Sequence, residues 1–131
     1  MTDTITHVWP GLRYHDAPAA LAFLVEAFGF VETARYPGAE PHSIGHAELR
    51  WPAGGGVMLG SVRADSVISD LPAGTGSVYV VTDDIDALFD RAVAAGARVV
   101  RGLQEEEYGS QGFTVRDPEG VYWSFGTYQG E

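Results

Sequence analysis

Three side chains of this sequence are candidates for proton transfer or for holding a metal ion: His7, His46 and Glu48. His46 and Glu48 are two residues apart, so on a β-strand their side chains point to the same face. Imidazole and carboxylate groups placed in this way can act as a general base or bind a divalent cation. The alternative interpretation is that His7 and His46 are only polar residues in a pocket wall. The other two histidines, His15 and His42, are interpreted as exposed loop residues.

Several other kinds of chemistry are excluded by residues that the sequence lacks. It contains no cysteine, which excludes thiol catalysis, disulfides and thiolate metal sites. No Ser-His-Asp or Cys-His arrangement is visible in sequence order. The glycine run 54–56 precedes a predicted strand, so it indicates a hairpin turn rather than a phosphate-binding loop.

Size and charge narrow the class of protein. The chain has 131 residues, of which 45% are hydrophobic and 20% charged, as is typical of one soluble globular domain. Its 18 acidic and 8 basic residues give a net charge of −10. This charge repels nucleic acid and anionic membranes and favours a cationic partner, although acidity that simply maintains solubility is the alternative. Without a signal-peptide pattern or an apolar run long enough to span a membrane, we expect a cytoplasmic protein with no nucleic-acid or membrane partner.

The first half of the chain predicts one strand, one helix and three further strands. Residues 8–14 predict the first strand, and Asp16 can cap the helix that follows. The helix presents one apolar face and ends at Gly29; that face consists of Leu21, Leu24, Val25 and Phe28. The predicted strands after it are residues 30–36, 44–51 and 57–62.

The second half predicts the same order after a polar linker over residues 63–76. A strand over residues 78–82 leads to a helix that Asp83 or Asp84 caps and Gly96 ends. The apolar stripe of this helix consists of Ile85, Leu88, Phe89, Ala92 and Val93. Three more strands follow at residues 97–101, 112–116 and 121–125. The two halves therefore form a weak internal repeat.

The last two strands form a hairpin around residues 117–120, Asp-Pro-Glu-Gly, which are the residue types that a type I turn prefers. On the return strand, one set of alternating side chains is predicted to lie in the core: Val121, Trp123 and Phe125. The other set faces whatever the sheet encloses, and it consists of Tyr122, Ser124 and Gly126.

This hairpin, Asp-Pro-Glu-Gly-x-x-Trp-x-Phe preceded by Tyr108-Gly-Ser, resembles the last hairpin of the vicinal oxygen chelate superfamily. That superfamily includes glyoxalase I, extradiol dioxygenases, fosfomycin-resistance enzymes and bleomycin-resistance binding proteins, and the resemblance extends from Val8 to Tyr128. It implies an α+β fold in which two βαβββ modules form a cup-shaped mixed sheet with the helices outside. The whole chain, 1–131, would be one such domain, with module one at about 5–62, a linker at 63–76 and module two at 77–128.

The resemblance also implies where a metal would bind. Metal-dependent members place four ligands inside the cup, and the matching positions here are Trp9, Met58 or Gly60, Ser77 and Ser124. None of these groups is a good ligand for a divalent cation. We therefore expect no metal and no cofactor.

The same positions define the inner face of the cup, because strand neighbours two residues apart share a face. That face is aromatic, small and hydroxylated: Trp9, Gly11, Ser77, Tyr79, Tyr122, Ser124 and Gly126. It suits a flat, partly apolar ligand. Trp51 and Trp123 are interpreted as core residues instead. The loop 104–109 contains Glu105–Glu107 and Tyr108, and it is either a solvated loop or a lid whose carboxylates attract a cation.

Two functions follow as hypotheses. The first is a metal-free homodimer that sequesters an aromatic natural product or antibiotic, either neutral or cationic, in the manner of bleomycin-resistance proteins. Its predicted ligand-binding residues are Trp9, His7, His46, Ser77, Tyr79, Tyr108, Tyr122 and Ser124. The second is a glyoxalase- or dioxygenase-like enzyme, a lyase or oxidoreductase of natural-product metabolism. It would use a displaced metal site or a general base drawn from His7, His46 and Glu48.

Overall fold

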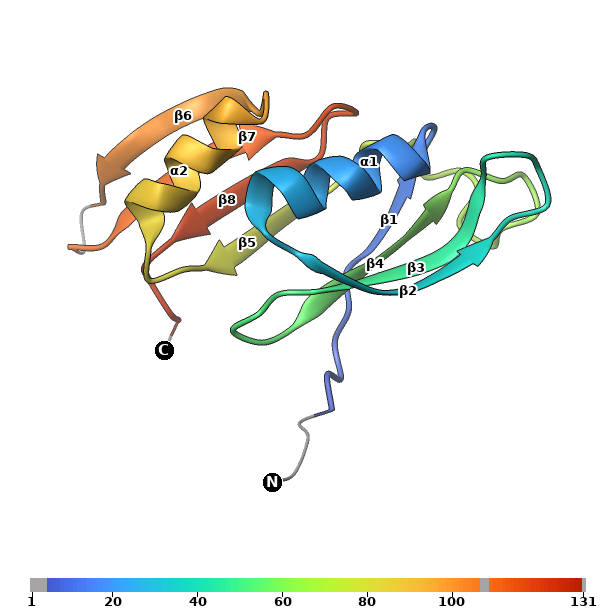
Figure 1. Ribbon diagram of the computed structural model, residues 1–131, viewed down its shortest axis with the longest axis horizontal. Helices are drawn as coiled ribbons and strands as arrows, with labels where there is room; N and C mark the ends of the chain where they lie inside the picture. The colour runs from blue at the N-terminus through green and yellow to red at the C-terminus, as the bar shows by residue number, and fades with distance from the viewer. Residues whose placement is uncertain (1–4, 107–108, 131) are drawn as a thin grey trace.

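The computed structural model describes residues 5–106 and 109–130, which form two modules in chain order (Figure 1). Module one consists of β1 (Gly11–Tyr14), α1 (Ala17–Phe23), the π-helical turn η1 (Leu24–Phe28), β2 (Val31–Pro37), β3 (Ile44–Arg50) and β4 (Gly56–Ser61). Module two consists of β5 (Ser77–Val81), α2 (Ile85–Ala94), β6 (Arg98–Glu105), β7 (Gln111–Arg116) and β8 (Tyr122–Gly126). The predicted α+β class and the two βαβββ modules are confirmed.

Each module folds its four strands into a mixed sheet with the same arrangement. The strand orders are β1-β4-β3-β2 and β5-β8-β7-β6. In both sheets the first and last strands of the module pair in parallel, and the remaining pairs are antiparallel. The internal repeat seen in the sequence is therefore a repeat of topology, and η1 packs against α2 where the two modules meet (Figure 1).

The first helix begins as predicted but ends differently. The side chain of Asp16 accepts a hydrogen bond from the backbone N–H of Ala19 at 3.1 Å, and Gly29 ends the helical segment at φ 90°. The last turn before it is π-helical rather than α-helical. Arg91 of α2 donates to the carbonyls of Glu26 and Val25 at 2.8 and 3.2 Å, and the Val25 carbonyl also accepts from the N–H of Gly29 at 3.1 Å. A cation from module two therefore binds carbonyl groups at the end of the helical segment.

Several predicted boundaries also shift. Strand β1 begins at Gly11 and not at Val8, so Trp9 precedes the strand, and β6 continues to Glu105, four residues beyond its predicted end. In α2 the predicted stripe is wrong at its last member, because Val93 is 44% exposed. Asp84 occupies the position before α2, but its side chain makes no capping hydrogen bond.

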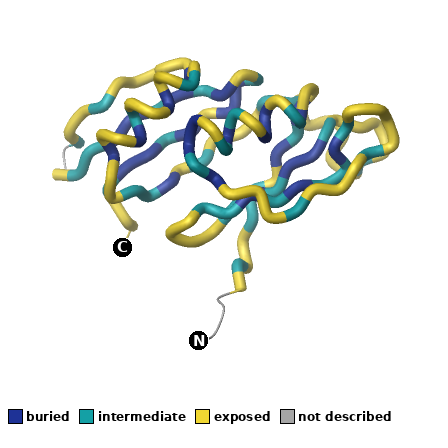
Figure 2. Tube along the Cα trace, in the orientation of Figure 1, coloured by how far each residue is buried: buried dark blue, intermediate teal, exposed yellow. Residues whose placement is uncertain are grey.

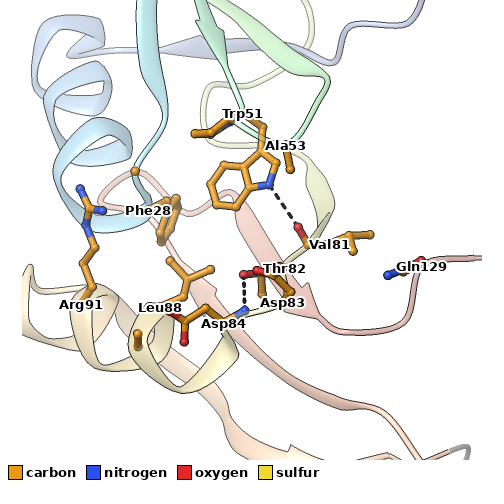
Figure 3. Close-up of a pocket in the computed structure, with 13 residues that line it drawn as sticks. Phe28, Trp51, Ala53, Val81, Thr82, Asp83, Asp84, Leu88, Arg91 and Gln129 are labelled. Carbon is orange, nitrogen blue, oxygen red and sulfur yellow. Dashed lines mark hydrogen bonds between the residues drawn. The ribbon is translucent and has the colours of Figure 1, made fainter.

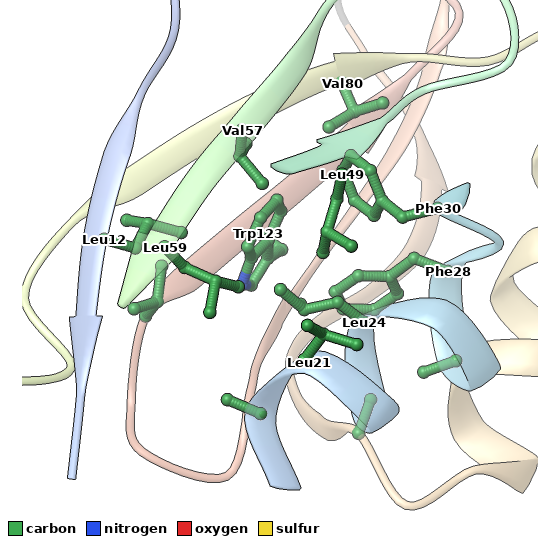
Figure 4. Close-up of a cluster of buried hydrophobic side chains, with 14 of the residues drawn as sticks. Leu12, Leu21, Leu24, Phe28, Phe30, Leu49, Val57, Leu59, Val80 and Trp123 are labelled. Carbon is green, nitrogen blue, oxygen red and sulfur yellow. The ribbon is translucent and has the colours of Figure 1, made fainter. Parts of the chain in front are cut away.

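The two modules share one hydrophobic core, which Figures 2 and 4 show beneath α1. Trp123 of β8 lies at its centre, fully buried as predicted, with its ring centroid 5.4 Å from Phe28 and 5.6 Å from Phe30. Leu49 and Val57 of module one approach it from the other sheet (Figure 4). Because the largest core side chain of module two packs among residues of module one, neither module buries its apolar face alone.

A buried carboxylate fixes the junction between the modules. Asp117 is only 2% exposed; its Oδ2 accepts hydrogen bonds from Tyr14 Oη at 2.6 Å and Trp123 Nε1 at 3.0 Å. Its Oδ1 accepts from three backbone N–H groups of the turn, those of Glu119, Gly120 and Val121. The predicted turn is confirmed by the bond from Gly120 N–H to Asp117 C=O at 3.0 Å and by the φ of 110° at Gly120. Burial, followed by the charge of Asp117, raises the pKa of Tyr14.

A second carboxylate of the same turn holds the start of α1. Glu119 accepts hydrogen bonds from the backbone N–H groups of His15 at 2.6 Å and Asp16 at 2.7 Å. Both N–H groups lie at the strand-to-helix junction of module one. None of the described helices is long and apolar enough to cross a bilayer.

Candidate functional site

Four of the predicted site residues lie together on the helix-distal face of module two. The register pairs Ser77 with Tyr122 and Tyr79 with Ser124, and Thr114 of β7 is opposite Ser124 on its other side. The hydroxyl oxygens of Thr114 and Ser124 are 2.9 Å apart. We call the hollow of about 240 Å³ beside them the hydroxyl hollow; it is lined by Tyr79, Arg101, Glu106, Gln111, Gly112, Phe113, Thr114, Ser124, Phe125 and Gly126.

Gly126 leaves room for the aromatic ring of Tyr79 at this hollow. A Cβ on Gly126 would lie 3.1 Å from ring carbons of Tyr79, which means that the tyrosine ring rests on bare backbone. The Tyr79 hydroxyl donates to the carbonyl of Tyr128 at 2.7 Å, which fixes the orientation of the ring. Next to it, Tyr122 is partly exposed, and the Arg116 guanidinium lies 4.5 Å above the centre of its ring.

The rim of the hydroxyl hollow differs from the loop that the sequence suggested. Glu105 belongs to β6, and Glu106 accepts two hydrogen bonds from Arg101, at 2.6 and 2.8 Å. These bonds lower the pKa of Glu106. Glu106 is therefore neither a freely solvated carboxylate nor free to attract a cation. The predicted lid residue Tyr108 and its neighbour Glu107 lie outside the described residues.

His46 and Glu48 lie on the helix-distal face of module one. His46 Nε2 and Glu48 Oε2 are 2.9 Å apart, and the imidazole stacks on Tyr36 at a centroid distance of 6.2 Å. His46 also lines a hollow of about 180 Å³ together with Gly11, Leu12, Arg13, Met58, Leu59 and Ile68. The predicted pair thus exists, but on a different sheet from Tyr79 and Ser124.

Trp9 and His7 occupy the segment before β1. The Trp9 indole donates to the carbonyl of Thr6 at 2.9 Å, and the Arg50 guanidinium lies 4.6 Å from the centre of the ring. A Cβ on Gly56 would lie 2.8 Å from the same ring. Protein groups thus already contact this indole, whereas His7 is exposed. The role of both residues in ligand binding stays a prediction.

The implied metal positions do not form a set of donors that fits a divalent cation. The Ser124 hydroxyl is bonded to Thr114, Trp9 has no donor atom for a metal, and Met58 offers only a thioether. Over residues 5–106 and 109–130, no three His, Asp or Glu side chains are grouped closely enough to hold a metal ion.

A further cavity, which the sequence did not indicate, lies between the modules. We call it the junction groove: a cavity of about 450 Å³ between the start of α2 and the turn after β3 (Figure 3), lined by Phe28, Gly29, Trp51, Pro52, Ala53, Val81, Thr82, Asp83, Asp84, Ala87, Leu88, Arg91 and Gln129. Trp51 does pack against core residues as predicted, at 5.1 Å from Phe30, but it also forms a wall of this cavity. A tryptophan placed directly before a proline-glycine turn was the one signal in the sequence that could have indicated such a role.

Comparison with known proteins assigns the chain to a family. The model of the Glyoxalase/Bleomycin resistance protein/Dioxygenase superfamily matches residues 4–125. The uncharacterized proteins Rv0887c of Mycobacterium tuberculosis and Mb0911c of Mycobacterium bovis are each 36% identical to this chain over 126 residues. The matched regions cover 89% of this chain and 71% and 80% of the two relatives, respectively.

Solved structures agree with this assignment. TioX from Micromonospora sp. ML1 is 34% identical, with a TM-score of 0.80 over 95% of this chain and 100% of TioX. A glyoxalase/bleomycin resistance protein/dioxygenase family enzyme from Burkholderia phytofirmans PsJN shares the fold at 20% identity, with a TM-score of 0.73 over 93% of this chain and 98% of its own. The chain belongs to the glyoxalase/bleomycin resistance protein/dioxygenase superfamily.

Proposed function

We propose that this protein binds and sequesters a flat aromatic compound, such as a natural product or an antibiotic, without using a metal ion. The observation that carries the proposal is the hydroxyl hollow. A tyrosine ring rests there on a bare glycine backbone beside the Thr114–Ser124 hydroxyl pair. A planar ligand would stack on the ring of Tyr79 and take its orientation from the two hydroxyl groups.

The size of the hollow suggests that a second copy of the chain completes the site. At about 240 Å³ it is smaller than the roughly 300–1,000 Å³ typical of small-molecule sites. The edge strands β2 and β6 expose apolar side chains, including Val31, Tyr36, Val99 and Val100. Exposed edges and apolar side chains of this kind favour association with another chain. We therefore propose a homodimer, to be tested by sedimentation equilibrium.

A thermal-shift screen of planar aromatic compounds tests the binding function. A ligand present at 100 times its dissociation constant adds about 2.7 kcal/mol to the free energy of unfolding. For a compound that binds, Tyr79→Ala should weaken affinity about tenfold, because the stacked ring contributes roughly 0.5–1.5 kcal/mol beyond its buried area. Ser124→Ala should weaken it less. The control is Ser69→Ala, a serine in the linker.

Two outcomes would contradict the proposal. One is a ligand whose affinity is unchanged in both Tyr79→Ala and Ser124→Ala. The other is metal that stays bound in stoichiometric amount after dialysis and whose removal by a chelator abolishes ligand binding.

The His46–Glu48 pair favours one second candidate, an enzyme that uses a general base. A carboxylate 2.9 Å from Nε2 orients the imidazole, which is the arrangement that proton abstraction requires. His46→Asn should then abolish turnover of a bound compound while leaving its affinity nearly unchanged. Turnover that persists in this variant would exclude His46 as the base.

A further inference from the structure

We propose that the junction groove is a second ligand site that binds protonated aromatic amines. It shares no lining residue with the hydroxyl hollow. Its volume of about 450 Å³ falls within the roughly 300–1,000 Å³ range of small-molecule sites.

The inner part of the groove is apolar and held in place. Phe28 and Leu88 are buried, and Trp51 lies across the gap from Leu88 (Figure 3). The Trp51 N–H donates to the carbonyl of Val81 at 3.1 Å, and the ring packs edge-on against Phe30. Because the polar atom of the indole already has its partner, the part of the ring that lines the groove offers apolar and stacking contacts.

Two carboxylates at the start of α2 give the groove its charge. Asp83 and Asp84 are both exposed. Within the described residues, neither side chain makes a hydrogen bond or an ion pair, although Asp84 occupies the capping position of α2. These carboxylates are therefore not needed to hold the fold.

The other charges that face the groove do not cancel this pair. Arg91 directs its guanidinium to the carbonyls of Val25 and Glu26, away from the two aspartates. The start of α2 adds about half a positive charge from the helix dipole. The two carboxylates still outweigh the one charge of Arg91 and that half charge taken together, and the net charge of −10 for the whole chain acts in the same direction.

Apolar walls beside unpaired carboxylates define the class of ligand. An aromatic ring would lie between Trp51 and Leu88, and an ammonium group one or two carbons away would reach Asp83 or Asp84. An anion of the same shape would be repelled, and a neutral analogue would keep the ring contacts but lose the ion pairs.

Tryptamine and its neutral analogue tryptophol are the probes that test this proposal on the intact protein. In ¹⁵N-labelled protein, tryptamine should shift the amide signals of Asp83, Asp84 and Ala87 and the Trp51 indole signal, which Trp51→Phe identifies. Tryptophol should bind about three- to tenfold more weakly, as expected for the loss of exposed ion pairs.

A charge-matched pair of double variants isolates the two carboxylates. Asp83→Asn with Asp84→Asn should reduce tryptamine affinity about three- to tenfold and leave tryptophol affinity unchanged. The control, Asp86→Asn with Asp90→Asn, removes the same charge from α2 at positions that do not line the groove, and tryptamine affinity should stay as in the wild type.

Three results would overturn the proposal. They are equal affinity for the two probes, an equal effect of the two double variants, and shifts confined to residues of the hydroxyl hollow. A groove that fails this test leaves the sequestration function standing, because that function depends on Tyr79 and Ser124 and not on Asp83 and Asp84.

Discussion

The two modules have the same strand order but contribute unequally to the junction between them. Asp117, Glu119 and Arg91 of module two all bind groups of module one: a tyrosine hydroxyl, two backbone N–H groups and two carbonyls at the end of η1. In the other direction, Trp51 donates one hydrogen bond to Val81. The repeat is therefore one of topology, and the polar residues that join the halves are mostly a property of module two.

The sheet faces that point away from the helices also differ between the two modules. Module one presents the charged pair His46–Glu48, whereas module two presents a tyrosine, a pair of hydroxyl groups and bare glycines. The first surface suits proton transfer, and the second suits stacking and orientation of a flat ring. The two halves thus share one topology but carry side chains of different chemistry.

Of the variants that test this difference between the modules, Asp117→Ala is expected to reduce stability most. The change removes the acceptor of five hydrogen bonds and leaves buried donors, including those of Tyr14 and Trp123, without partners. We expect a loss of about 3–5 kcal/mol in the free energy of unfolding, measured by urea denaturation.

The control for this variant is Asp65→Ala, whose side chain is exposed and which should change stability by less than about 0.5 kcal/mol. If Asp117→Ala does not fold, Asp117→Asn, which keeps one oxygen acceptor, should give a smaller loss. Equal stability of the Asp117 and Asp65 variants would show that the junction does not depend on this carboxylate.

A smaller loss of stability is expected for Tyr14→Phe, which removes one of the hydrogen-bond donors to Asp117. The loss of its bond to Asp117 should cost about 1–3 kcal/mol. Burial and the charge of Asp117 raise the pKa of Tyr14 above its usual 10.0, so the folded state keeps a proton that the unfolded state releases. Stability from this group is thus complete below pH 10.0 and decreases as the pH rises above it.

Urea denaturation between about pH 9 and 11 measures this slope. The wild-type protein should lose stability over that range, and Tyr14→Phe should lose less. Identical slopes would mean that Tyr14 ionises equally easily in the folded and unfolded states.

The smallest of the three effects is expected for Arg91→Gln. Loss of the cation that binds the end of η1 should lower stability by about 1 kcal/mol and speed amide exchange in residues 24–30. Arg98→Gln, an exposed arginine on β6, is the control and should change neither quantity. Unchanged exchange in η1 with Arg91→Gln would show that the π-helical turn is set by module one alone.

Features that depend on neighbouring residues in the sequence were predictable. Asp16 caps α1 through a contact three residues away, and the turn at 117–120 follows from its own four residue types. The alternation on β8 likewise placed Trp123 in the core and Ser124 on the accessible face, and the alternation on β5 placed Tyr79 on that same face, because a strand alternates its side chains regardless of context.

Features that depend on distant residues were not predictable in the same way. The π-helical turn is contacted by Arg91, 66 residues from Val25, so the helix pattern alone suggested an ordinary α-helix. The Arg50 contact with Trp9 and the junction groove likewise exist only once separate elements are packed together. The binding role of the site residues stays a prediction, because sequence spacing assigns a face but not an occupant.

The position of Trp123 has a consequence for cutting the chain. Its indole fills space among side chains contributed by the first half, such as Phe28 and Leu49. A fragment that ends before residue 77 would therefore have a solvent-exposed cavity in place of that indole, and a fragment that begins at residue 77 would expose the indole to water. Each fragment should be poorly folded alone, whereas the two mixed together should recover structure, because burial of the Trp123 indole among side chains of the first fragment drives their association.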